Sequence, residues 1–158
     1  MKTNHNIQEL DLKNLKDFLI KNNNDFDMFK NKGWDIRNIG LQLKKTTNFS
    51  IGYYDKSELL GFVVGDKIPN DINFDLEIYL FYVERNLRRK NIGTELLNFI
   101  NKQKIQLNIK KIFLEVSELN QNAINFYEKN GFVLFKIRHN YYREKNLNIS
   151  AKCYYKIL

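Results

Sequence analysis

The chain has 158 residues, of which 43% are hydrophobic and 14% aromatic, so it can bury a core and is too apolar for a disordered protein. We expect residues 1–158 to form one domain. Cys153 is the only cysteine, which leaves no intrachain disulfide. With no apolar run of signal-peptide or membrane-spanning length, we expect a cytoplasmic protein.

The formal net charge is +8, and it can be read in two ways. It could serve an anionic partner such as RNA, a ribosomal surface or the phosphates of a cofactor. However, most of the charge is lysine spread along the chain, and dispersed charge relates first to solubility. We therefore expect no requirement for direct nucleic-acid binding. We also expect no metal site, because His5 and His139 lack other ligand types at useful spacing.

The first half of the chain predicts one strand, two helices and a hairpin. A short strand over 7–10 precedes a helix that Asp11 can cap and that the asparagine-rich run at 22–25 ends. A second helix is expected over about 35–44. Alternating residues over 48–54 and 59–66 then predict a hairpin that turns at 55–57.

The second half predicts strands that alternate with helices. A long strand over 73–83 is apolar on both faces, which is typical of the middle of a sheet. The remaining elements are a helix starting near 92, a strand over 111–116, a helix over about 120–130 stopped by Gly131, and strands over 132–142 and 151–157 with 144–148 between them. This order predicts an α+β fold, a mixed and mostly antiparallel sheet of about seven strands flanked by about four helices.

The loop between the long strand and the next helix has the composition of an anion site. Unpaired N–H groups and the helix dipole attract anions at a helix N-terminus. A glycine without Cβ lets a phosphate approach the backbone. The alternative is an ordinary basic loop, since short glycine motifs give many false matches. The loop residues are Arg88, Arg89, Lys90, Asn91, Ile92, Gly93 and Thr94.

Glu115 lies in a strand that reads as interior. Because side chains alternate along a strand, Ile112, Leu114 and Val116 share one face, and Glu115 takes the other with Phe113. Burying a carboxylate is costly, so one in this position is a candidate general base. The alternative is a glutamate that reaches solvent at the strand end or pairs with a lysine. Glu77, in the long strand, is the other candidate base.

Several further side chains are candidate site residues. The phenol of Tyr127 has a reference pKa of about 10, close to that of an aliphatic thiol, and so could protonate a departing thiolate; the alternative is a core tyrosine. Asn120 is expected to cap the helix, with a ligand contact as the second possibility. Tyr141 and Tyr142 either pack at the rim of a strand or hold a peptide backbone.

Two sets of residues resemble the GNAT acetyltransferases. The run Arg88-Arg89-Lys90-Asn91-Ile92-Gly93 is similar to that family's acetyl-CoA signature, Arg/Gln-x-x-Gly-x-Gly/Ala, with Asn91 at the first glycine. Asparagine is the side chain that best tolerates a left-handed backbone. A second set is most similar to the ribosomal-protein-alanine N-acetyltransferases, which modify the N-terminal alanine of small-subunit protein S18: Leu114-Glu115-Val116, Asn120, Ala123, Phe126-Tyr127-Glu128, Gly131-Phe132 and Arg138-His139-Asn140-Tyr141-Tyr142.

The resemblance implies a GNAT-like domain whose central strands splay apart and bind acetyl-CoA, without a metal. It implies acetyl transfer to a protein N-terminal α-amino group, with Glu115 as base and Tyr127 as acid. We expect a monomer, and the resemblance implies a small-subunit ribosomal protein as the acceptor. The residues assigned to the cofactor are Tyr82, Val83, the loop from Arg88 to Thr94, Asn120 and Tyr127, and those assigned to the acceptor are Glu77, Tyr141 and Tyr142.

Two alternatives stay open at this point. The first is a GNAT enzyme that acts on a small-molecule amine such as a polyamine or an aminoglycoside. Acidic residues on the acceptor side would favour it, with Asp66, Asp71 and Asp75 as candidates. The second is a domain that binds RNA or the ribosome and has lost catalysis.

Overall fold

The computed structural model describes residues 5–30, 33–144 and 147–158, so residues 1–4 and the centre of the turn expected at 144–148 lie outside the described parts. The described residues form one seven-stranded sheet in the order β1-β2-β3-β4-β5-β7-β6, in which β4 and β5 run parallel and the other neighbours antiparallel. The strands are β1 (His5–Glu9), β2 (Asn48–Asp55), β3 (Glu58–Asn70), β4 (Asn73–Val83), β5 (Ile109–Ser117), β6 (Val133–Glu144) and β7 (Leu147–Ile157).

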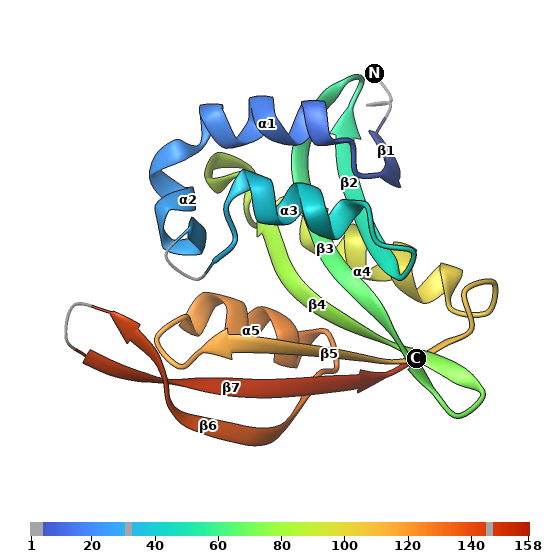
Figure 1. Ribbon diagram of the computed structural model, residues 1–158, viewed down its shortest axis with the longest axis vertical. Coiled ribbons are helices and arrows are strands. Elements are labelled where there is room, and N and C mark those ends of the chain that lie inside the picture. The colour runs from blue at the N-terminus through green and yellow to red at the C-terminus, as the bar shows by residue number, and fades with distance from the viewer. Residues whose placement is uncertain (1–4, 31–32, 145–146) are drawn as a thin grey trace.

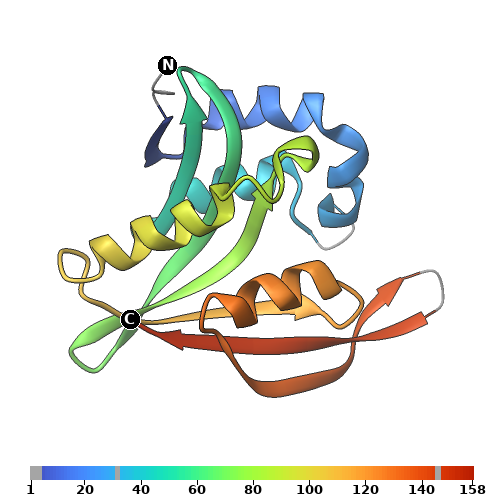
Figure 2. The ribbon, with the colours of Figure 1, turned by 180° about the vertical axis from the view of Figure 1, so that it is seen from behind.

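Helices cover both faces of the sheet (Figures 1 and 2). They are α1 (Leu12–Lys21), α2 (Asn23–Lys30), α3 (Ile36–Leu43), α4 (Ile92–Gln103) and α5 (Gln121–Lys129), with a 3₁₀ turn at Arg85–Leu87. The arrangement confirms the α+β, GNAT-like expectation. None of the helices in the described residues is both long and apolar enough to cross a membrane.

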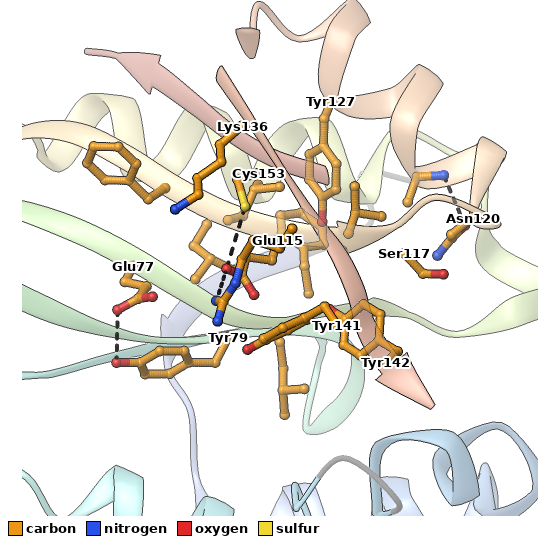
Figure 3. Close-up of a pocket in the computed structure, with 18 of the residues that line it drawn as sticks. Glu77, Tyr79, Glu115, Ser117, Asn120, Tyr127, Lys136, Tyr141, Tyr142 and Cys153 are labelled. Atoms are coloured by element: carbon orange, nitrogen blue, oxygen red, sulfur yellow. Dashed lines mark hydrogen bonds and ion pairs between the residues drawn. The ribbon is translucent and has the colours of Figure 1, made fainter. Parts of the chain in front are cut away.

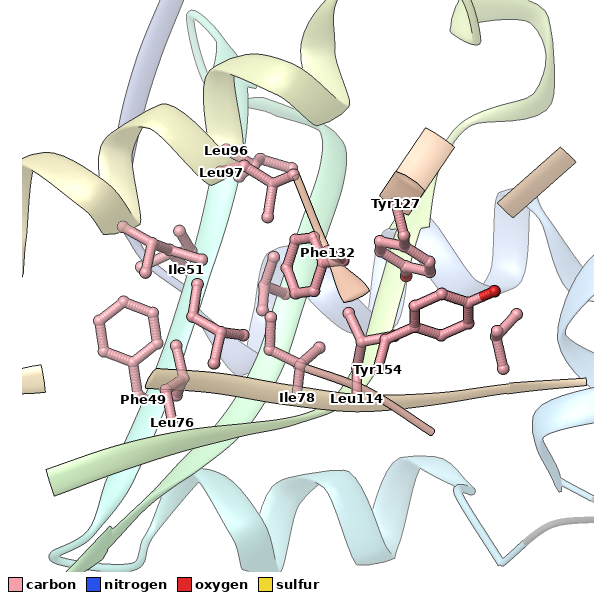
Figure 4. Packing of buried hydrophobic residues seen from close by; sticks show 14 of the residues in the cluster. Phe49, Ile51, Leu76, Ile78, Leu96, Leu97, Leu114, Tyr127, Phe132 and Tyr154 are labelled. Carbon is pink, nitrogen blue, oxygen red and sulfur yellow. The ribbon is translucent and has the colours of Figure 1, made fainter. Parts of the chain in front are cut away.

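Each face of the sheet has its own hydrophobic core. The α1–α3 core includes Leu15, Phe18, Phe26, Ile39, Phe62, Val64, Leu80 and Tyr82. The α4–α5 core includes Phe49, Ile51, Leu76, Ile78, Leu96, Leu97, Leu114, Tyr127, Phe132 and Tyr154 (Figure 4). The two cores share the sheet between them, so the path of its strands decides which side chains face which core.

The asparagine-rich run ends α1 as expected, but a further helix follows it. Asn22 caps α1 with its backbone N–H on the Phe18 carbonyl, and α2 begins at the next residue. The polar composition gave no sign of α2. Tertiary packing accounts for this helix, because Phe26 is buried against Phe18 and stacks on Phe62 with 5.9 Å between the ring centres. Packing of an apolar residue here overrides weak helix propensity.

Strand β4 carries one extra residue relative to β3. In the register Ile78 lies opposite Gly65 and Leu80 lies opposite Val64, which leaves Tyr79 without a partner on β3. Such a bulge bends the strand and shifts the alternation of its side chains. Ile78 accordingly joins the α4–α5 core, whereas Leu80 joins the α1–α3 core.

The pairing of β4 with β5 stops at the same point. It runs from Phe74 opposite Ile109 to Ile78 opposite Leu114. Beyond this pair β4 stays with β3, whereas β5 stays with β7 as far as Ser117. The two ribbons diverge in Figures 1 and 2, as the expected splayed central pair requires.

Helix α5 ends in a Schellman motif at the predicted glycine. The N–H of Phe132 donates to the Tyr127 carbonyl and the N–H of Gly131 to that of Glu128, both at 3.0 Å. Gly131 has φ +82°, in the left-handed region. This glycine therefore fixes the last turn of α5, the turn that carries Tyr127.

We predict that Gly131→Ala lowers the free energy of unfolding by roughly 1–2 kcal/mol, because an L-residue is strained at this φ. Gly40→Ala is the matched control. Gly40 lies inside α3, and a Cβ there would meet Leu12 at an ordinary 3.6 Å, so this change should not destabilise the fold. Urea unfolding of the three proteins measures both. Equal midpoints for Gly131→Ala and the parent would contradict the argument.

Candidate active site

An open pocket of about 980 Å³ lies where β4 and β5 part (Figure 3). Its walls come from β4, β5, the start of α5, the β6–β7 hairpin, and the segment around α2 and α3. Six of the residues that the resemblance assigns to catalysis, the cofactor or the acceptor line it: Glu77, Glu115, Asn120, Tyr127, Tyr141 and Tyr142. The gap in the sheet thus gathers residues that are far apart along the chain.

Glu115 and Tyr127 reach this pocket from opposite faces of the sheet. On β5 the buried residues Leu114 and Val116 face the α4–α5 core, and Glu115 between them points to the other face, as the alternation predicted. Tyr127 comes from α5, on the side of the α4–α5 core. Both nevertheless line the same pocket, because none of the described strands fills the space between β4 and β5 beyond Ile78 and Leu114.

The carboxylate of Glu115 contacts side chains of β6 and β7. Nη1 of Arg138 lies 2.6 Å from its Oε1 atom, and Sγ of Cys153 lies 3.6 Å from the same oxygen. Cys153 is the cross-strand partner of Glu115 on β7. The charge of the interior glutamate is therefore balanced by an arginine of β6, whereas the sequence suggested a lysine or solvent.

A wide bulge in β6 shapes the wall beside Glu115. Arg138 pairs with Ala151 and Tyr142 with Ile149, so β6 has two more residues than β7 between these pairs. Consecutive residues of a regular strand point to opposite faces. Here the bulge, with Asn140 at φ +54°, lets Tyr141 and Tyr142 line one pocket.

Glu118 satisfies the backbone of β7 opposite this bulge. Its carboxylate accepts the N–H of Ser150 at 2.6 Å, and its own N–H donates to the Ser150 carbonyl at 3.0 Å. The hydrogen bond from Ser150 lowers the pKa of the Glu118 carboxyl below its ordinary value. The loop between β5 and α5 is thereby fastened to the hairpin that carries Tyr141 and Tyr142.

Tyr127 sits in an aromatic cage on the α5 side of the pocket. Its ring makes edge contacts with Phe132 at 5.4 Å and Phe81 at 6.1 Å, and Figure 3 shows it pointing from α5 into the pocket. Burial raises the pKa of the phenol well above its ordinary value. The group is therefore protonated throughout the neutral range. Asn120 caps the same helix, accepting the Ala123 N–H at 3.2 Å.

The basic loop before α4 has an unusual backbone. Arg89 and Asn91 have φ values of +64° and +69°, so two non-glycine residues close together are left-handed. Such conformations are strained and concentrate at ligand sites. Asn91 is the N-cap of α4, yet its side chain makes no capping hydrogen bond with any described residue. The first N–H groups of α4, from Ile92 to Thr94, accordingly have no acceptor one turn back in the helix.

Arg88 ties this loop to the end of β4. Its Nε atom donates to the Val83 carbonyl at 3.1 Å, and its guanidinium lies 5.2 Å from the ring centre of Tyr82. The backbone N–H of Glu84 donates to the carbonyl of Leu60 on β3 at 3.0 Å. Because N–H groups alternate sides along a strand, the N–H of Val83 is directed to the other edge, from which β5 has parted.

Gly93 and Tyr82 have packing roles that the sequence did not indicate. A Cβ on Gly93 would meet the ring of Phe126 at 3.0 Å, so the glycine lets α4 approach α5 closely. The Tyr82 side chain is buried in the α1–α3 core against Phe18 and Phe26. Neither residue, nor Val83 or the rest of the loop from Arg88 to Thr94, lines the pocket.

Acidic side chains gather on the β4 wall. Glu77 and Asp75 line the pocket, and Glu77 accepts a 3.4 Å hydrogen bond from Tyr79. The Asp75 Oδ1 atom is buried and finds no hydrogen-bond partner among the described residues. Asp66 is buried beside Lys45, 3.3 Å away, and Asp71 is exposed in the turn between β3 and β4. Of the three aspartates considered from the sequence, only Asp75 lines the pocket.

Other pocket residues were not predicted as site residues. Trp34 stacks on Tyr79 at 5.2 Å and lines the pocket together with Phe29 of α2. The one hint in the sequence was that Trp34, the residue after Gly33, is the single tryptophan of the chain. The neighbouring residues did not indicate which strand it would contact. Arg138 belonged to the run used for the family resemblance, and its contact with Glu115 depends on the strand order β5-β7-β6.

The architecture matches known acetyltransferases over nearly the whole chain. Arabidopsis thaliana NAA60 in complex with a bisubstrate analogue has TM-score 0.80 and 14% identity, covering 97% of each chain, and the same protein with acetyl-CoA has TM-score 0.78 and 17% identity, covering 98% of each. The ribosomal-protein-S18-alanine N-acetyltransferase from Escherichia coli has TM-score 0.74 and 16% identity, covering 97% of this chain and 93% of that one. At these identities the likeness concerns the fold.

The sequence itself supplies the family assignment. Residues 15–132 match the family model described as the acetyltransferase (GNAT) family. This match begins within α1 and runs past the end of α5, and so includes the basic loop, the parted strands and both Glu115 and Tyr127. The chain therefore belongs to the GNAT family of acetyltransferases and is an N-acetyltransferase.

Proposed function

We propose that the protein transfers the acetyl group of acetyl-CoA to the N-terminal α-amino group of a protein in the cytoplasm, with a small-subunit ribosomal protein as the candidate acceptor. One observation carries the proposal: Glu115 and Tyr127 line one pocket at the parting of β4 and β5. The fold-level likeness to the S18-alanine enzyme supports the choice of acceptor class.

In this proposal the two side chains perform the acid–base chemistry. Glu115 takes a proton from the acceptor's ammonium group, which frees the nitrogen lone pair to attack the thioester carbonyl. Tyr127, kept protonated by its burial, donates its hydroxyl proton to the sulfur as the carbon–sulfur bond breaks, and the second proton that the nitrogen loses on becoming an amide returns to the Tyr127 oxygen. The N–H of Val83 is directed to the gap, where it would stabilise negative charge on the carbonyl oxygen.

The cofactor assignments rest on the strained loop. Acetyl-CoA supplies the activated acetyl group. Its pyrophosphate would be held by the N–H groups from Asn91 to Thr94 at the start of α4, with Arg88, Arg89 and Lys90 adding positive charge. Two left-handed residues next to a helix start are consistent with an anion cradle. Tyr82 would contribute through its main chain, since its side chain is buried in the other core.

A small-molecule amine is the second candidate acceptor. The observation that favours it is the pair Asp75 and Glu77 on the acceptor wall, with the Asp75 Oδ1 atom buried and unpartnered among the described residues. A buried carboxylate oxygen without a donor is costly, and a second cationic group of a polyamine or an aminoglycoside would satisfy it. Tyr141 and Tyr142 favour a peptide acceptor over a small-molecule amine, because two phenols at the rim of a pocket can bind a peptide main chain.

The direct test is incubation with acetyl-CoA and a set of acceptors. We expect hexapeptides that begin with alanine to gain 42 Da at the α-amino group (one acetyl), ahead of those that begin with serine or methionine, and mass spectrometry with fragmentation locates the group. Spermidine and an aminoglycoside are the competing acceptors. Preferential acetylation of either would replace the peptide proposal with the second candidate.

We predict that Glu115→Gln lowers kcat by roughly 10²–10⁴-fold, because the amide cannot accept the proton from the acceptor. Glu77→Gln is the matched comparison on the facing strand, and it should alter mainly the acceptor KM. Steady-state assays of both variants decide between the two carboxylates. Near-normal turnover of Glu115→Gln together with an inactive Glu77→Gln would move the base to Glu77.

Tyr127→Phe removes the proposed acid while keeping the ring that packs on Phe81 and Phe132. We expect kcat to fall by roughly 10²-fold or more, with calorimetric acetyl-CoA affinity within a few-fold of the parent. Because burial raises the phenol's pKa, the parent should show no alkaline loss of kcat from this group below about pH 10. Unchanged kcat in Tyr127→Phe would remove the acid role.

A further inference from the structure

Three aromatic side chains pack against one another on a part of the sheet that none of the described helices covers. They are Phe113 on β5, Phe135 on β6 and Tyr155 on β7, and their ring centres lie 5.8 to 6.3 Å apart. We call these three residues the aromatic cluster. None of them belongs to either hydrophobic core of the described chain. Their rings therefore contribute to a separate apolar surface.

The helices leave this surface open. Phe113 shares its face of β5 with Glu115, the face turned away from the α4–α5 core. On that side α1, α2 and α3 lie against the half of the sheet that contains β1 to β4, and β5, β7 and β6 extend beyond them (Figure 1). The α1–α3 core of the described residues accordingly includes none from these three strands. The ring of Phe135 is 52% exposed.

A second bulge in β6, near the start of the strand, directs Phe135 to the cluster. Leu134 pairs with Tyr154 and Lys136 pairs with Cys153, so Phe135 is an extra residue between two regular pairs. Bulges of this kind re-aim side chains and are common next to active sites. Here the bulge lets the consecutive residues Phe135 and Lys136 line one pocket.

The aromatic cluster continues the floor of the candidate active-site pocket. Phe113 and Phe135 both line this pocket together with Glu115. Phe113 precedes Glu115 by two residues, which corresponds to about 7 Å along a strand. The pocket therefore runs from the gap between β4 and β5, past the proposed base, to an apolar surface.

The two phenols of the rim lie at the other end of this path. Arg138 is level with Ser117 across β7, two residues beyond Glu115 on β5. Tyr141 and Tyr142 follow Arg138 toward the tip of the hairpin. An acceptor whose amine lies in the gap, between the phenols and Glu115, accordingly extends over the aromatic cluster.

We propose that the aromatic cluster binds an apolar side chain at the third residue of the acceptor peptide. The inference rests on the proposed function and names a specificity-determining site for it. An extended peptide advances about 3.3 Å per residue, so its third residue lies about 7 Å from its first, the separation of Phe113 from Glu115 along β5. A large apolar side chain at this place would remove the exposed rings from water, which is favourable.

The surroundings of the cluster favour an apolar side chain over a charged one. The three rings carry no charge, and charges of both signs border them. Lys136 follows Phe135 on β6, and Glu77 pairs with Phe113 across β4 and β5. An acidic or a basic side chain would therefore meet a like charge as well as an opposite one, whereas an apolar side chain meets the rings.

The first experiment measures kcat and KM of the parent at saturating acetyl-CoA. The acceptors are hexapeptides that begin Ala-Ser and differ only at the third residue, which is phenylalanine, leucine, serine or glutamate. We expect KM for the phenylalanine and leucine peptides to be roughly tenfold below that for the serine peptide, with kcat within about twofold, because binding that is equal in the ground and transition states changes KM alone.

The second experiment places this preference on the cluster. In Phe135→Ala we expect the KM values for the phenylalanine and serine peptides to converge to within about twofold. Phe135→Tyr keeps the ring and should keep the preference. Leu134→Ala is the matched control, because Leu134 is the neighbouring residue, 41% exposed, and does not line the pocket. Thermal melts identify any variant that fails to fold, and the peptide series of the parent then decides the question.

Three results would overturn the inference. The lowest KM for the glutamate peptide would assign this surface to Lys136. A full preference for phenylalanine in Phe135→Ala would place the apolar site elsewhere on the molecule. Sedimentation that shows a parent dimer, dissociated by Phe135→Ala, would show that a second copy of the chain covers the cluster.

Failure of the underlying proposal has a different signature. If the parent acetylates spermidine and none of the peptides, the peptide acceptor is wrong and the role of the cluster falls with it. If the parent acetylates all four peptides with the same KM, the proposed function stands and only the site for the third residue is lost.

Discussion

The site depends on a competition between strand pairings in the middle of the sheet. β4 pairs with β5 only as far as Ile78 and Leu114, and each strand then follows its other neighbour. Parallel neighbours normally keep their ladder because open N–H and C=O groups are costly inside a protein. Here the extra residue at Tyr79 lies directly after the last pair with β5, so the bulge in β4 coincides with the end of the ladder.

The same bulge determines which of the two hydrophobic cores each side chain of β4 faces. Before it, Ile78 packs in the α4–α5 core. After it, Leu80 and Tyr82 pack in the α1–α3 core and Phe81 reaches the aromatic cage of Tyr127. The cage could not be completed without this change of face, since Phe81 would otherwise point to the α1–α3 side. One inserted residue therefore marks the start of the gap and also supplies part of its wall.

Local rules were enough to predict most elements and some of the site. Capping by Asp11 and Asn120, the stop at Gly131 and the outward face of Glu115 all follow from neighbouring residues. The sequence could not show helix α2, because its formation depends on distant aromatic partners. It also could not show the bulges, because a register shift is a property of two strands.

The contacts of Glu115 show why part of the site could not be predicted from the sequence. Arg138 lies 23 residues away, and its contact requires the hairpin of β6 and β7 to pair with β5 in one register. An alternating pattern gives the face of a residue but not its neighbour across the strands. The run Arg138 to Tyr142 could therefore be matched to a family, while the stack of Arg138 on Tyr141 could not be foreseen.

The distribution of charge matters more than its net value of +8. Basic residues from Arg88 to Lys90 surround the helix start, where an anion would be favoured. On the β4 wall of the pocket the charged side chains are the carboxylates of Asp75 and Glu77, whereas Glu115 on β5 is paired with Arg138. A cation approaching that wall meets local negative charge in a chain that is positive overall, because short-range contacts outweigh distant charges that salt screens. The dispersed lysines are thus compatible with an amine acceptor, and the parted strands separate the anion-favouring side from the cation-favouring side.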